Sequence, residues 1–74
     1  MYLPFQSVHK ELQVPKEYYD LYPNSKNSDR RTYSAMVSAM DDAIGTVVDK
    51  LNSTALLDNT IIIFLSDNGA PAAL

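Results

Sequence analysis

The residues best suited to chemistry are Asp67 and Asn68, which follow the apolar run at positions 61–65 after a single serine, Ser66. A carboxylate and an amide carbonyl are hard oxygen ligands of the kind that Ca²⁺ and Mg²⁺ prefer. The run lacks alternation, which predicts a strand over 60–65 buried on both faces, with a ligand-binding or metal-binding turn at 66–69. Asp-Asn-Gly is also a common hairpin turn, although residues 70–74 make a poor returning strand.

His9 is the second candidate, and it is the only histidine in the chain. Residues 2–5 predict a strand that ends at or near Pro4, because proline cannot donate to a sheet ladder. A loop is predicted over 6–28, and it places His9 just beyond the carboxyl end of that strand. The alternative is an ordinary surface histidine that makes a single hydrogen bond.

A long helix must connect these two sites, and the pattern predicts it over 30–52, with Ser28 or Asp29 as its cap. Its apolar residues recur every three or four positions and form one stripe. Gly45 is expected where another backbone comes close. The stripe consists of Tyr33, Met36, Val37, Met40, Ile44, Val47, Val48 and Leu51. Asp41, Asp42, Asp49 and Lys50 fall outside it and are interpreted as a solvated face.

The order strand, loop, helix, strand predicts an α/β fold, namely one βαβ unit with a right-handed crossover. Both strands would run the same way, so His9, Asp67 and Asn68 would emerge at one edge of the sheet. One helix covers only one face of a parallel sheet. The chain is therefore expected to be an internal piece of a larger α/β domain.

Composition restricts the possible functions. The 74 residues carry a net charge of -3 and no cysteine, and Arg30 and Arg31 are the only adjacent basic pair, so a nucleic-acid partner is not expected. No apolar run is long enough for a membrane span, and no signal peptide is recognisable. The triplet Asn52-Ser53-Thr54 is an acceptor sequence for N-glycosylation, a weak indication of a secretory route.

Three stretches together resemble the sulfatase family, and most closely its arylsulfatase B (N-acetylgalactosamine-4-sulfatase) branch. They are residues 3–9 (LPFQSVH) with 12–15 (LQVP), residues 31–45 (RTYSAMVSAMDDAIG) and residues 58–69 (DNTIIIFLSDNG). The resemblance implies a catalytic domain with an alkaline-phosphatase-like, mostly parallel sheet. It also implies hydrolysis of sulfate esters, including those of glycosaminoglycan sugars or aryl sulfates, by a lysosomal or secreted enzyme.

The resemblance further implies roles for individual residues. Asp67 and Asn68 would be ligands of a divalent cation, calcium in the arylsulfatases, and His9 would contact the sulfate and assist the departing oxygen. The formylglycine nucleophile of the family arises from a cysteine in a Cys-x-Pro-Ser-Arg sequence. This chain has no cysteine, so the nucleophile is expected outside it, and the chain alone is expected to be inactive.

Two other functions remain open. The chain could be a non-catalytic product, truncated or degenerate, whose helix serves only for packing. It could also belong to a phosphate-ester hydrolase of the same superfamily, with the same metal-binding edge and a serine or threonine nucleophile. The residues do not separate sulfate from phosphate.

Overall fold

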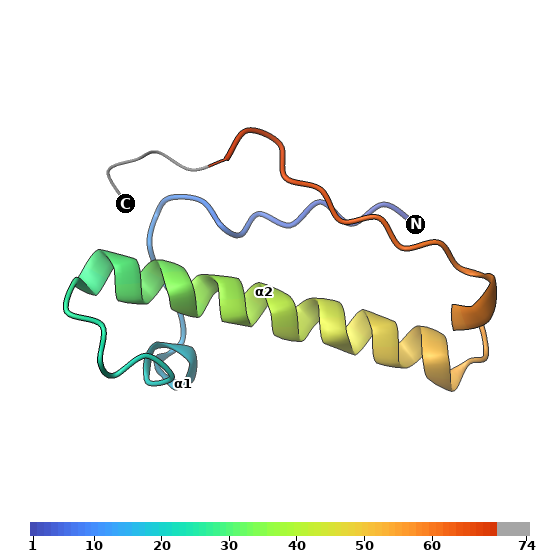
Figure 1. Cartoon of the computed structure of the whole chain (residues 1–74), viewed down its shortest axis with the longest axis horizontal. Coiled ribbons are helices and arrows are strands. Elements are labelled where there is room, and N and C mark those ends of the chain that lie inside the picture. The colour runs from blue at the N-terminus through green and yellow to red at the C-terminus, as the bar shows by residue number, and fades with distance from the viewer. Residues whose placement is uncertain (70–74) are drawn as a thin grey trace.

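A computed structural model describes residues 1–69, and one long helix dominates it (Figure 1). The elements are α1 (Lys16–Tyr19), α2 (Ser28–Ser53) and the short 3₁₀ helix η1 (Leu57–Asn59). Extended segments precede α1 and follow η1. Figure 1 shows both segments running in the direction opposite to α2, with α1 across the helix from the segment that follows η1.

The ends of α2 are defined by local hydrogen bonds. Asn27 is the N-cap, and its side-chain oxygen accepts from the backbone amides of Asp29 (2.9 Å) and Arg30 (3.1 Å). The expected cap at Ser28 or Asp29 was wrong, because Asn27 lies one residue earlier and satisfies two otherwise unpaired amides. The helix thus begins two residues before the predicted start and ends one residue after the predicted end.

The carboxyl end of α2 is closed by a Schellman motif. The amide of Leu56 donates to the carbonyl of Leu51 (2.9 Å), and that of Ala55 donates to the carbonyl of Asn52 (3.1 Å). Ala55 has φ 60°, the left-handed conformation that usually favours glycine and costs other residues about 1–2 kcal/mol. This turn reverses the chain and directs residues 60–69 back along α2.

The predicted βαβ unit is wrong for the part of the chain that the structure describes. Residues 2–5 and 60–65 are extended, but neither forms a strand, and no backbone hydrogen bond joins them. The run is not buried either: Ile61 is 89% and Ile63 is 75% exposed. An apolar run of residues with high β-propensity forms a strand only where a neighbouring strand accepts and donates its backbone hydrogen bonds. Two extended segments beside one helix do not make a stable parallel sheet.

Two faces of α2 are in contact with other parts of the chain. The apolar stripe, apart from Met36, faces residues 1–12 and 60–69. A second face, which we call the tyrosine face, consists of Arg31, Ala35, Ser38 and Asp42 and packs against α1 and the loop after it. Among residues 1–69, only Ala35 (0% exposed) and Met36 (5%) are buried. No helix among residues 1–69 is long and apolar enough to cross a membrane.

Gly45 does not meet another backbone, contrary to the expectation from the sequence. A Cβ atom placed there would have no other atom within 4 Å outside the local helix backbone. We therefore expect Gly45→Ala to raise the free energy of unfolding by about 0.5–1 kcal/mol, because alanine loses less backbone entropy in a helix. Urea unfolding measures this, with Ala43→Gly at an exposed position of α2 as the reverse control. Destabilisation by Gly45→Ala would show that another segment packs against this site.

Candidate functional site

One wide groove holds the three residues that the sequence singled out for chemistry. Residues 1–12, the apolar stripe of α2 and residues 60–69 line it, and its volume is about 1810 Å³. His9 lines it from the first extended segment, whereas Asp67 and Asn68 line it from the second. Both segments run in the same direction along α2 (Figure 1). The structure thus brings all three to one surface.

The turn at Asp67 and Asn68 is held by its own side chains. Asp67 Oδ1 accepts from the backbone amide of Asn68 (2.7 Å), and Asn68 Nδ2 donates to the carbonyl of Gly69 (2.9 Å). Gly69 has φ 75°, a left-handed conformation that glycine adopts without strain. In this arrangement Asp67 Oδ2 and Asn68 Oδ1 make no hydrogen bond within residues 1–69, and both side chains are exposed.

These two oxygens suit a hard cation in type, though not in number. Ca²⁺ takes six to eight oxygen ligands in proteins. Within the described chain no group of three or more His, Cys, Asp or Glu side chains is arranged to hold a metal ion. Asp67 and Asn68 therefore fit as part of a coordination shell, and the other ligands of such an ion would come from outside residues 1–69.

His9 is exposed, and one ring nitrogen has a defined partner. Its Nδ1 lies 3.0 Å from the carbonyl oxygen of Lys10. A carbonyl can only accept, so Nδ1 carries the proton and Nε2 is the nitrogen left for a ligand. When it is protonated, the remaining nitrogen can donate to an anion or a leaving oxygen, which is the chemistry that the family resemblance implies for it.

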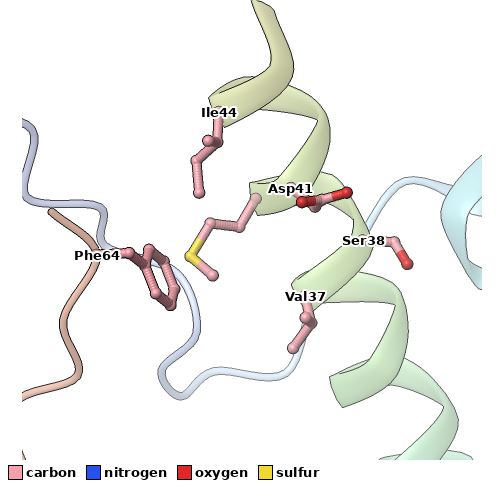
Figure 2. A pocket seen from close by; sticks show the side chains of 6 residues that line it. Val37, Ser38, Asp41, Ile44 and Phe64 are labelled. Atoms are coloured by element: carbon pink, nitrogen blue, oxygen red, sulfur yellow. The ribbon is translucent and has the colours of Figure 1, made fainter. Parts of the chain in front are cut away.

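The apolar run is linked to α2 through Phe64. A cavity of about 410 Å³ lies between them, lined by Val37, Ser38, Met40, Asp41, Ile44 and Phe64. Figure 2 shows the Phe64 ring turned toward α2, with Ile44 and Val37 on the facing side, while Asp41 and Ser38 point away from the ring. Phe64 thus faces the helix just before the turn at Asp67, although it is 69% exposed. Asp41 plays no part in the candidate site.

The tyrosine face of α2 escaped the sequence analysis. The Arg31 guanidinium lies 3.8 Å from the ring centroid of Tyr19, and its Nε donates to the Tyr19 carbonyl (2.9 Å). The hydroxyl of Tyr22 hydrogen-bonds that of Ser38. Tyr19 and Tyr22 thus contact α2, and Asp42 on the same face is exposed, as the sequence predicted.

Tyr18 completes this packing. A hydrogen bond to the Asp42 carboxylate raises the pKa of Tyr18, with smaller contributions from desolvation and from the nearby negative charges of Asp42 and Glu17. The sequence does contain a signal for this face, because its residues recur at spacings of four, three and four. Three of these four residues are polar, so a search for apolar stripes along the helix does not detect the face.

Asn52, the acceptor residue of the glycosylation triplet, lies in the last turn of α2 and is exposed. The Thr54 hydroxyl donates to the carbonyl of Lys50 (2.8 Å) at the helix end. The acceptor amide is therefore on an accessible helix terminus.

The whole chain matches the family model described as "Sulfatase", over residues 1–73. It is 42% identical to arylsulfatase J of Mus musculus over 69 residues, which covers 93% of this chain and 12% of that protein. It is 37% identical to an arylsulfatase of Klebsiella aerogenes over 65 residues (84% and 14%) and 37% identical to the choline-sulfatase of Rhizobium meliloti over 51 residues (69% and 10%).

The chain thus spans only a small part of the length of these relatives. No solved structure matches it significantly. Because the family model covers nearly every residue, the chain belongs to the sulfatase family.

Proposed function

We propose that the protein containing this chain hydrolyses sulfate esters, and that residues 1–69 contribute one side of its active site. The observation that carries this proposal is the shared groove, in which a histidine and two hard oxygen ligands face the same space in a member of the sulfatase family. The remaining machinery, including a formylglycine nucleophile, is assigned to parts of the protein outside this chain.

Asp67 and Asn68 are proposed as two ligands of a calcium ion. Such an ion, when bound, neutralises charge on the sulfate oxygens. The hydrogen bonds of the turn leave one oxygen of each side chain without a partner among residues 1–69, and Gly69 allows the sharp bend. In this role the two side chains hold the ion.

His9 is proposed to contact the sulfate and assist departure of the ester oxygen. With Nδ1–H committed to the Lys10 carbonyl, Nε2 is free for the substrate, and in the doubly protonated imidazolium it donates to the oxygen on which negative charge develops as the ester bond breaks. Donation at this atom stabilises the leaving alkoxide. A sugar alkoxide is a poorer leaving group than a phenolate, so a sugar sulfate needs this assistance more than an aryl sulfate does.

The substrate class and cellular site follow from the resemblance of residues 3–9, 31–45 and 58–69 to the arylsulfatase B branch. On this basis the proposed substrates are sulfated sugars of glycosaminoglycans, and aryl sulfates as model substrates. The proposed location is the lysosome or the extracellular space.

A direct test compares two esters of one leaving group. The protein that contains this chain should release 4-nitrophenol from 4-nitrophenyl sulfate with a kcat/KM at least about 100-fold above that for 4-nitrophenyl phosphate, and Ca²⁺ chelation should abolish the sulfatase reaction. Faster hydrolysis of the phosphate would assign the protein to the phosphate-ester hydrolases of the superfamily. Absence of both activities would indicate a non-catalytic product.

N-glycosylation of Asn52 supplies a separate test of the secretory location. We expect the protein expressed in a secretory host to lose mass on treatment with a peptide N-glycosidase, since Asn52 is exposed at a helix end. Asn52→Gln should remove the part of this shift that is due to the site, and so should Thr54→Ala. Thr54→Ser preserves the acceptor sequence and is the matched control. Equal shifts for the parent and Asn52→Gln would show that the site is not used.

A further inference from the structure

His9 lies in a segment with few attachments of its own. Its ring hydrogen-bonds only the neighbouring Lys10 carbonyl, and residues 1–14 make no backbone hydrogen bond within the part of the chain that the structure describes. A catalytic histidine needs a defined position, because a displacement of about 1 Å can lower a rate by 10²-fold. The first fixed point after His9 is α1, which starts at Lys16.

Arg31 makes three contacts that hold α1 and the following Asp20 on α2. Its Nε donates to the Tyr19 carbonyl, its guanidinium stacks on the Tyr19 ring, and its terminal nitrogen lies 3.8 Å from Asp20 Oδ1. The side chain is only 19% exposed, so solvent screens these contacts less than it would on the open surface. The hydrogen bond between the hydroxyls of Tyr22 and Ser38 adds a further attachment just after α1.

We infer that Arg31 is a positioning residue for His9: it fixes α1 on the tyrosine face of α2 and thereby limits where the preceding segment can carry the histidine. Figure 1 shows this segment crossing from the groove side of α2 to the α1 side, so the two ends of the crossing lie on different faces of the helix. Leu12 and Val14 within the crossing are half-buried, and Pro15 stiffens its end. This inference rests on the role proposed for His9.

The test is a double-mutant cycle in the full-length enzyme. Arg31→Lys keeps the charge but loses the Nε–H donor and the planar group that stacks on Tyr19. We expect it to lower kcat about 10-fold to 100-fold at a similar KM, because the ground-state ligands Asp67 and Asn68 are untouched. In a His9→Ala background the same substitution should change kcat by less than about 2-fold, since its target is gone.

The neighbouring Arg30 provides the control. It is exposed, and its guanidinium lies 5.7 Å from the Tyr33 ring centroid without a side-chain hydrogen bond among residues 1–69. Arg30→Lys should leave kcat within about 2-fold of the parent, as is usual for an exposed substitution. If Arg31→Lys fails to fold, Tyr19→Leu enters the same cycle, because it removes the stacking and keeps the backbone acceptor.

The outcomes separate the two claims. If His9→Ala lowers kcat but Arg31→Lys does not, or lowers it equally in both backgrounds, the positioning role is overturned while the role of His9 stands. If His9→Ala leaves kcat unchanged, the role of His9 fails and the positioning role falls with it.

Discussion

Asp67→Ala in the full-length enzyme should abolish sulfate-ester hydrolysis through loss of the metal. Loss of a second-shell partner already lowers metal affinity or activity about 10-fold to 100-fold, so loss of a direct carboxylate ligand should lower kcat/KM by more than about 100-fold. This carboxylate lines the groove at an exposed turn, and its Oδ2 has no hydrogen bond among residues 1–69. Kinetics with 4-nitrophenyl sulfate and the calcium content of the purified protein measure the two effects together.

Asp49→Ala is the matched control for this substitution. Asp49 is an exposed carboxylate of α2 that does not line the groove, and alanine is favourable in a helix. The control should retain calcium and activity. Near-normal activity of Asp67→Ala would rule out the assignment of the turn as a metal-binding site.

His9→Ala should lower kcat about 10²-fold to 10⁴-fold with calcium retained, the range expected when a general acid is removed. The loss should depend on the leaving group. Nitrophenolate departs with little assistance, whereas a sugar alkoxide needs a donor, so the decrease should be at least about 10-fold larger for a sulfated sugar than for 4-nitrophenyl sulfate.

Lys10→Ala is the control, since the backbone carbonyl that accepts from His9 Nδ1 remains. It should leave both rates close to those of the parent. An equal decrease for both substrates in His9→Ala would contradict a role at the leaving oxygen. Unchanged kcat would reduce His9 to a surface histidine.

The long helix and its approximate ends could be predicted from local sequence signals. The spacing of apolar residues in α2 predicts the helix, and the turn formers before it predict its approximate start. Pairing of the segments 2–5 and 60–65 could not be predicted in the same way. A strand exists only where another backbone completes its hydrogen bonds, and that condition depends on neighbours and not on the run itself. The exposed Ile61 and Phe64 show the consequence.

The candidate site was predictable in residue type because its chemistry is local. A carboxylate, an amide and a glycine in succession favour a turn with oxygens free for a cation, and the structure has such a turn at residues 67–69. The contacts that hold α1 were not predictable from apolar periodicity. The Arg31 guanidinium stacks on the Tyr19 ring and its Nε donates to the Tyr19 carbonyl. Nothing in the sequence around Arg31 indicates either contact.

The most direct measurement is a crystal structure of the full-length protein, from crystals grown with Ca²⁺ and inorganic sulfate. The proposal predicts calcium, identified by its anomalous signal, at about 2.3–2.6 Å from oxygens of both Asp67 and Asn68. It also predicts His9 Nε2 within about 3.2 Å of an oxygen of a sulfate bound at the same metal. Calcium bound elsewhere, or a sulfate at the metal with His9 out of reach, would contradict the account.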